Sequence, residues 1–172
     1  MYKILLMGYM GVGKSTVGRI LAEKLGILFV DLDEEIERTA GKTIPEIFKS
    51  QGEIVFRRIE AQVLEQILSK KEQAVVALGG GTPAYGSNLS QILAEPNYAV
   101  YLKASLATLL SHLKGEQDKR PLLQQMSEED LPEYIAKHVF ERQAYYQQAH
   151  RTLTIEGKSP AEIANEIIAG LA

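Results

Sequence analysis

The chain has 172 residues and no cysteine, with an apolar share of 45%, a charged share of 24% and a net charge of −3. This length and composition are those of one globular domain with a sizeable core. The net charge argues against a nucleic-acid binder that depends on a basic face. The missing cysteines exclude a disulfide, a thiolate zinc site and a cysteine nucleophile. With no signal-peptide pattern and no apolar run of membrane-spanning length, we expect a cytoplasmic protein that binds neither nucleic acid nor membrane.

Five short apolar runs alternate with helical patterns, and each is predicted to form a strand: 2–7, 27–30, 74–78, 98–102 and 152–155. This alternation indicates an α/β three-layer sandwich, a parallel sheet with helices on both faces. Two helix starts are marked by capping boxes, "TIPE" at 43–46 and "SPAE" at 159–162, and "SEED" at 127–130 is a weaker start. Ligands of such sheets bind at the carboxyl ends of the strands, so the residues after each run are the candidates for a site.

The stretch "GYMGVGKST" at residues 8–16 follows the first predicted strand and precedes an amphipathic helix. Its spacing, Gly8, four residues and then "GKST", is the full P-loop pattern. Glycines allow backbone N–H groups to surround a phosphate, Lys14 can reach the terminal phosphates, and Ser15 can offer its hydroxyl to Mg²⁺. The start of the next helix adds partial positive charge. The alternative, a glycine-rich turn that binds nothing, does not account for the strand before the loop and the helix after it.

Two carboxylates follow the second predicted strand, in the tripeptide "DLD". Asp31 completes an apolar run and resembles a Walker B carboxylate, close to the P-loop. Asp33 has two interpretations: it binds a hydroxyl of a ligand, or it is the N-cap of the helix that contains "EEIERTAG". For an isolated aspartate, the capping role would be the commoner one.

Three further features contain candidate site residues. The triple glycine 79–81 follows the third strand and would let a ligand lie against main-chain N–H groups, although a bare triple glycine is also a tight turn. Arg57 and Glu60 share one helical face, which indicates either part of a site or a solvated ion pair. Arg142 and Tyr146 share a face of a later helix, and an ordinary surface helix explains them equally well.

The segment 115–125, "GEQDKRPLLQQ", is charged, begins with glycine and is interrupted by proline. It is predicted to be a mobile surface segment. Arg120 on a closing loop can stabilise charge on a phosphoryl group in transfer, although an arginine in a charged loop is more often only solvated. The histidines at positions 112, 138 and 150 lack a metal-ligand spacing, and we assign them no role.

Taken together, these motifs resemble the shikimate kinase family. The matching stretches are "GYMGVGKST", "DLDEEIE", the run from Gly41 through "IPEIF", "GEIVFRRIE", "GGG", "RPLL" and "RQAYYQQA", in the family's order and approximate spacing over nearly the whole chain. The P-loop alone indicates only a superfamily, whereas the combination is far more specific. The resemblance implies a P-loop kinase fold with a five-stranded parallel sheet in the order 2-3-1-4-5. It also implies a single kinase domain over residues 1–172, with a mobile lid at about 115–125 and an acceptor-binding helical region at about 33–61.

The resemblance further implies a monomeric enzyme that uses ATP and Mg²⁺ to phosphorylate the 3-hydroxyl of shikimate, in aromatic amino acid biosynthesis. The implied catalytic residues are Lys14, Asp33 and Arg120, and the implied metal site is Ser15 with Asp31 behind a water. The implied nucleotide contacts are Gly11, Val12, Gly13, Lys14, Ser15, Thr16, Arg120 and Lys158. The implied shikimate contacts are Asp33, Arg57, Gly79, Gly80, Gly81 and Arg142.

Three positions depart from the family's pattern. Leu78 stands where a small or hydroxyl residue is usual, and Ala144 replaces a common proline. His112 and Lys114 occupy the region where an adenine-stacking arginine is frequent, which leaves the adenine contact open.

The nearest alternative is another small-metabolite kinase of this fold, such as a gluconate or nucleoside monophosphate kinase. A GTP-binding switch protein would need an N-K-x-D and a D-x-x-G string, and neither occurs in the sequence. A degenerate, non-catalytic nucleotide-binding module would be expected to have lost Lys14, Asp33 or Arg120, and all three are present.

Overall fold

The centre of the molecule is a five-stranded parallel sheet. The structure is a computed structural model that describes residues 2–114, 116, 120, 123–124 and 126–172. The strands are β1 (Lys3–Met7), β2 (Leu28–Asp31), β3 (Ala74–Ala77), β4 (Tyr98–Lys103) and β5 (Arg151–Thr154). Their order is β2-β3-β1-β4-β5, and each neighbouring pair is parallel. The predicted fold class and strand order are therefore confirmed.

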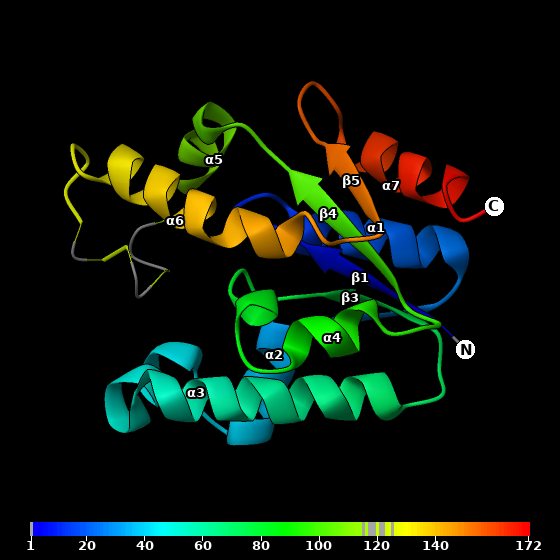
Figure 1. Cartoon of the computed structure of the whole chain (residues 1–172), viewed down its shortest axis with the longest axis horizontal. Helices are drawn as coiled ribbons and strands as arrows, with labels where there is room; N and C mark the ends of the chain where they lie inside the picture. Colours follow the sequence, from blue (N-terminus) through cyan, green and yellow to red (C-terminus); the bar gives the residue numbers. More distant parts are fainter. Residues whose placement is uncertain (1, 115, 117–119, 121–122, 125) are drawn as a thin grey trace.

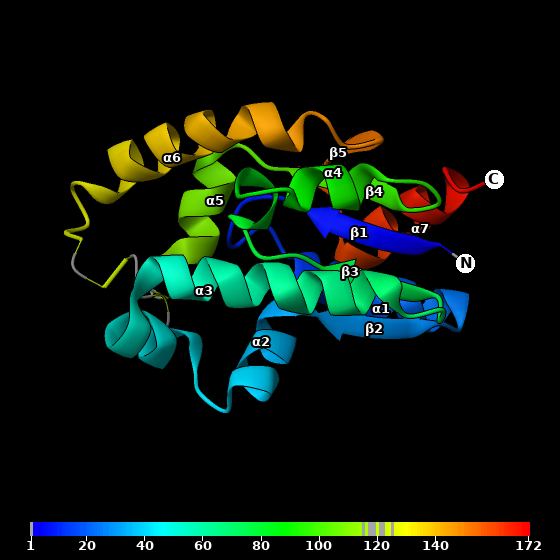
Figure 2. The ribbon, with the colours of Figure 1, turned by 60° about the horizontal axis from the view of Figure 1, so that its bottom comes forward.

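Helices cover both faces of the sheet and make the outer two layers (Figures 1 and 2). On one face α1 (Lys14–Leu25) packs against α7 (Pro160–Ala169). The other face carries α3 (Ile44–Ser69), α4 (Asn88–Leu93) and α6 (Leu131–Tyr146). The remaining α-helices lie beside these, α2 (Leu32–Ala40) against α3 and α5 (Leu106–Leu113) against α6. None of the helices within the described residues is long and apolar enough to cross a membrane.

The core follows from this layered arrangement. Because both faces are covered, the inner strands are mostly apolar, and every residue of β1 and β3 is buried, including Lys3, whose Nζ donates to the carbonyl oxygen of Lys70 at 2.6 Å. At the edge of the sheet β2 has neighbours on one side only, and its first residue, Leu28, is 57% exposed. Glycine and polar residues follow at the carboxyl ends of β1, β2 and β3. This edge of the sheet, at the carboxyl ends of the strands, is therefore where chemistry can be placed.

The two predicted capping boxes begin helices as expected. Thr43 and Glu46 exchange side-chain and main-chain hydrogen bonds at the start of α3, and Ser159 and Glu162 do the same at the start of α7. The weaker "SEED" signal also precedes a helix, since α6 begins at Leu131. Local hydrogen-bonding chemistry therefore decides these boundaries.

The N-cap of α2 is Asp31, and not Asp33 as one of the two interpretations of Asp33 predicted. Asp31 is the capping residue, and its Oδ1 accepts hydrogen bonds from the main-chain N–H groups of Asp33 (3.0 Å) and Glu34 (3.2 Å). The helix starts directly at the end of β2, two residues earlier than a cap at Asp33 would require. The capping interpretation of Asp33 is therefore wrong, because Asp33 is already a residue of the first turn of α2.

Helix α3 is bent at Gly52. This residue has φ 82° and ψ 174°, a left-handed φ that strains any residue with a Cβ, and it divides the helix into residues 44–51 and 53–69. The bend turns the first part of α3 across the end of the sheet (Figure 2). The predicted acceptor-binding region, 33–61, is made of α2, this first part and the next turns of α3.

The predicted lid lies mostly outside the described residues. Within 115–125, the structure describes Glu116, Arg120, Leu123 and Gln124. The predicted mobility of the segment therefore stays a prediction, whereas the position of Arg120 is part of the structure.

Candidate active site

The P-loop connects β1 to α1 as a cradle of main-chain groups. Gly13 is the N-cap of α1 with φ 100°, and no side chain caps the helix. The first N–H groups of α1 therefore keep their hydrogen-bonding capacity for a ligand. Together with the positive end of the helix dipole, they make an anion-binding site directly after the sheet.

Lys14 spans this loop. Its Nζ donates hydrogen bonds to the carbonyl oxygens of Gly8 (2.7 Å) and Tyr9 (3.1 Å). Loss of water around the ammonium lowers the pKa of Lys14 to about 8, and the nearby carboxylate of Asp33 opposes this shift. At neutral pH Lys14 is therefore still mostly protonated and can neutralise a phosphate.

Ser15 and Asp31 form the candidate metal site. Ser15 Oγ donates a hydrogen bond of 2.6 Å to Asp31 Oδ2, so a hydroxyl and a carboxylate face one another at the end of the P-loop. Oxygen ligands of this kind suit Mg²⁺. Within the described residues, no cluster of three or more His, Cys, Asp or Glu could hold a metal ion. This donor set therefore fits an ion that takes its other ligands from water and phosphate, as Mg²⁺ usually does.

A cavity of about 640 Å³ opens above the P-loop. All the predicted nucleotide contacts line it: Gly11, Val12, Gly13, Lys14, Ser15, Thr16, Arg120 and Lys158. We call it the nucleotide cavity. Lys158 forms an ion pair with Glu166 at 2.8 Å. His112, to which the sequence analysis assigned no role, also lines this cavity, and its Nδ1 donates a hydrogen bond of 2.7 Å to the carbonyl oxygen of Gly11.

A second cavity, of about 320 Å³, lies next to the first between α2, α3 and the triple glycine. All the predicted shikimate contacts line it: Asp33, Arg57, Gly79, Gly80, Gly81 and Arg142. We call it the acceptor cavity. One wall of the cavity is apolar and was not predicted from the sequence. It consists of Ile44, Pro45, Phe48 and Phe56. Such residues on an amphipathic helix have the same pattern as core residues, so no sequence signal separates the two.

Two arginines converge in the acceptor cavity. A Cβ on Gly81 would lie 2.8 Å from both terminal nitrogens of Arg57 and 3.0 Å from Nη2 of Arg142, so a larger residue here would displace the two guanidinium groups. The Arg142 residue is 7% exposed and the Arg57 side chain 15%. Two nearly buried cations facing one space favour an anion there, and a carboxylate matches the planar guanidinium group.

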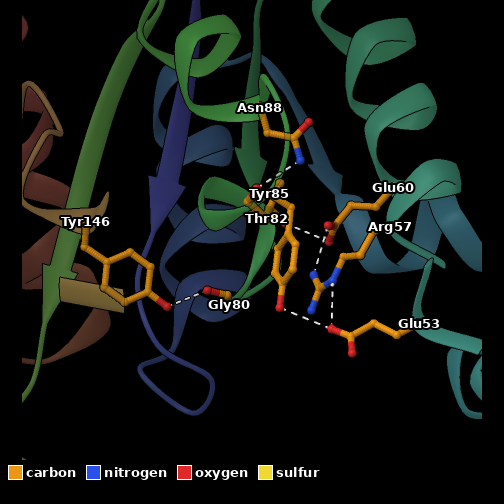
Figure 3. A network of polar contacts seen from close by, with 8 residues as sticks. All are labelled: Glu53, Arg57, Glu60, Gly80, Thr82, Tyr85, Asn88 and Tyr146. Atoms are coloured by element: carbon orange, nitrogen blue, oxygen red, sulfur yellow. Dashed lines mark hydrogen bonds and ion pairs between the residues drawn. The ribbon is translucent and has the colours of Figure 1, made fainter. Parts of the chain in front are cut away.

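The partner of Arg57 is itself buried. Glu60 Oε1 accepts a 3.0 Å hydrogen bond from Arg57 Nη1, and the Glu60 side chain is only 1% exposed. Arg57 and Glu60 are therefore not a solvated ion pair. Glu60 Oε2 also accepts from Thr82 Oγ1 at 2.9 Å, in the 3₁₀ helix η1 (Thr82–Ala84) that follows the glycines (Figure 3).

Two side chains hold the triple glycine and the residue that follows it, Thr82 (Figure 3). Asn88 Nδ2 donates to the carbonyl oxygen of Thr82 at 2.9 Å. The hydroxyl of Tyr146, on α6, donates to Gly80 O. Burial raises the pKa of Tyr146 to about 12, so this hydroxyl stays protonated and remains a donor. Arg142 and Tyr146, one helical turn apart on α6, thus both face the site.

Asp33 lies where the two cavities meet. Its side chain is reached by solvent through the cavities but is otherwise surrounded by protein. The pKa of Asp33 is raised to about 6, mainly because its carboxylate is poorly hydrated and to a smaller extent because the negative charges of Asp31 and Glu60 repel it. Arg120 also lines both cavities, and its Nη2 donates to Glu116 at 3.3 Å. Asp33, Arg120, Met10, Gly79 and Gly80 are the residues common to both.

The fold and the P-loop define a phosphotransferase of the P-loop kinase class, with a nucleotide cavity and an acceptor cavity side by side. The family model described as shikimate kinase matches residues 10–172. Curated relatives named shikimate kinase include those of Flavobacterium psychrophilum, 41% identical over 97% of both chains, and Flavobacterium johnsoniae, 42% identical over 98% of both. The chain belongs to the shikimate kinase family.

Solved structures agree with this assignment. Shikimate kinase from Acinetobacter baumannii, in complex with shikimate, is 36% identical with a TM-score of 0.90, over 98% of this chain and 92% of that one. Shikimate kinase from Bacteroides thetaiotaomicron is 30% identical with a TM-score of 0.88, over 99% and 97% of the two chains.

Proposed function

We propose that this enzyme transfers the terminal phosphoryl group of ATP to the 3-hydroxyl of shikimate. The observation that carries the proposal is the junction of the two cavities at Asp33 and Arg120. A phosphate bound at the P-loop and a hydroxyl bound in the acceptor cavity meet there. Phosphoryl transfer depends mainly on such alignment and on neutralising charge.

The acceptor cavity has the chemistry that shikimate requires. Shikimate has one carboxylate, three hydroxyls and a ring whose faces are apolar. Arg57 and Arg142 would bind the carboxylate, with Gly79, Gly80 and Gly81 against the ring and its polar groups. The wall formed by Ile44, Pro45, Phe48 and Phe56 would cover the apolar face of the ring.

The catalytic roles follow from charge and position. With its pKa at about 6, Asp33 is mostly ionised at neutral pH and would accept the proton of the reacting hydroxyl. Lys14 would leave the carbonyls of Gly8 and Tyr9 to bind the phosphates, and Arg120 would leave Glu116 to stabilise the group in transfer. Mg²⁺, held by Ser15 with Asp31 through water, would neutralise phosphate charge.

Three further properties are proposed from the sequence. The enzyme is expected to be a monomer, as the family resemblance implies, and to act in the cytoplasm. It is also expected to bind no nucleic acid, because its net charge is −3. Size-exclusion chromatography with light scattering tests the first of these, and a mass near 19.1 kDa is expected.

A coupled ADP-release assay tests the function. Shikimate, quinate, gluconate and AMP are each offered with MgATP, next to a reaction without acceptor. We expect ADP release with shikimate at a kcat/KM above that with any other acceptor, and phosphorus NMR of the product should place the phosphate on the 3-hydroxyl. Preferred use of gluconate or AMP would contradict the proposal and support another kinase of this fold.

A further inference from the structure

Two residues outside the acceptor cavity hold the Arg57 guanidinium (Figure 3). The ring of Tyr85 lies against it, with 3.9 Å between Arg57 Cζ and the ring centroid. The Tyr85 hydroxyl donates a 3.1 Å hydrogen bond to Glu53 Oε1, and the same oxygen lies 3.6 Å from Arg57 Nε. Neither Tyr85 nor Glu53 lines the cavity, so neither is a candidate for touching the acceptor.

Arg57 needs this support because its own polar contacts leave it free to turn. Glu60 holds only Nη1, and Nε is buried without a hydrogen bond. Among the described residues, no group accepts a hydrogen bond from Nη2. A guanidinium held at one nitrogen can rotate about that contact, whereas two parallel hydrogen bonds to a carboxylate require a fixed plane. The Tyr85 ring supplies a flat surface, and Glu53 supplies charge at the Nε edge.

Helical spacing in the second part of α3 brings Glu53 to this position. Gly52 ends the first part of the helix, so Glu53 is the first residue of the second part and lies one turn before Arg57. Tyr85 directly follows η1, and Thr82 at the start of η1 is bonded to Glu60. Glu53 and Tyr85 thus come from two elements that approach Arg57 from different sides (Figure 3).

We propose that Tyr85, together with Glu53, is a positioning residue that fixes the plane of Arg57 for the carboxylate of the acceptor. The inference rests on the proposed function, in which Arg57 binds that carboxylate. It predicts that Tyr85 acts on acceptor binding and hardly on the chemical step. Loss of the ring should raise KM for shikimate about 2- to 30-fold, the range expected for a cation–π contact.

Steady-state kinetics of four variants test this. With saturating MgATP, Tyr85→Leu should raise KM for shikimate by this factor and leave kcat and KM for ATP within about twofold. Tyr85→Phe keeps the ring and should recover most of the affinity, and Glu53→Ala should show a smaller rise than Tyr85→Leu. Tyr98→Leu is the matched control, because Tyr98 stacks on His150 at the start of β4, far from the site. An unchanged KM in both Tyr85→Leu and Glu53→Ala would overturn the proposal, as would an equal loss in kcat.

A spectroscopic measurement separates this inference from the proposed function. In ¹⁵N-edited NMR of the free protein, the Nε–H signal of Arg57, assigned by its loss in Arg57→Lys, should be shifted by the ring current of Tyr85. Tyr85→Leu should move it, and Tyr98→Leu should leave it in place. An unmoved signal overturns the positioning role even if the enzyme phosphorylates shikimate. A moved signal in an enzyme that ignores shikimate would reject the proposed function and leave the support of Arg57 standing.

Discussion

The nucleotide cavity and the acceptor cavity are built in different ways. The largest continuous part of the nucleotide cavity comes from one stretch of chain, residues 10–17, which offers the N–H groups of a loop and of a helix start. The acceptor cavity instead collects side chains from α2, α3 and α6 and the glycines of the turn after β3, over a stretch of more than 100 residues in sequence. The first is defined by local backbone geometry, and the second by packing.

This difference has a consequence for substitutions. A backbone cradle depends on few side chains, so a change at Lys14 should act on phosphate chemistry, whereas Val12 and Val17 of the same stretch belong to the core. In the acceptor cavity, Arg57, Glu60 and Thr82 are joined in one buried network, so a change at one residue is transmitted to the others. Nucleotide-side variants should therefore fail in turnover, and acceptor-side variants should fail in binding.

The largest effect is expected for Lys14→Ala. Lys14 is the ammonium that would bind the terminal phosphates, so turnover should fall by at least about a thousandfold, as for other groups that neutralise charge in phosphoryl transfer. The fold should be retained, as judged by circular dichroism and thermal unfolding, because Lys14 contacts only the loop. Lys24→Ala, at the exposed end of α1, is the matched control. ADP release at a near-normal rate by Lys14→Ala would remove the basis for the nucleotide site.

Arg120→Ala tests the junction of the two cavities. Because Arg120 lines both, we expect kcat to fall about a hundredfold or more while KM for shikimate changes by less than tenfold. Rapid-quench measurement of a single turnover should place the loss in the chemical step. Equal losses in binding and turnover would show that Arg120 supports the acceptor in the ground state rather than the group in transfer.

Arg57→Ala and Arg142→Ala test the acceptor side. Each removes one charge-assisted contact, worth about 1.5–3 kcal/mol, so shikimate affinity should fall roughly ten- to a hundredfold. ATP affinity measured without acceptor should change little, because neither residue lines the nucleotide cavity. Arg58→Ala, exposed and next to Arg57 on α3, is the control. Wild-type shikimate affinity in both variants, measured by titration calorimetry, would leave the two arginines without a binding role.

The smallest effect is a pH dependence. The pKa of Asp33 is raised to about 6, and only its ionised form can accept a proton. Below pH 6 the carboxyl is protonated, so kcat/KM for shikimate should fall about tenfold per pH unit, and above pH 6 it should level off. The measurement runs from pH 5 to 7.5 with saturating MgATP, so that titration of free ATP does not enter. A flat profile over this range would mean that Asp33 orients the hydroxyl without taking its proton.

Several features were predictable from sequence because they are decided locally. The five strands were found within one or two residues of their observed bounds, since a parallel strand covered on both faces needs a continuous apolar run. The capping boxes predicted the starts of α3 and α7, because the two residues of each box lie within one helical turn. The strand order was different: it came only through resemblance to a family, because the apolar runs do not encode which strands are neighbours.

The sequence by itself determined the five strands, the P-loop and the identity of the polar residues that follow the strands. Only the tertiary structure decided that Asp31 caps α2 while Asp33 faces the two cavities, and that the Arg57–Glu60 pair is buried. It also decided which apolar residues of α2 and α3 enter the core and which line the acceptor cavity. The physical reason is that exposure and partner choice depend on what packs opposite a residue, and in this protein the opposing element is usually far away in the chain.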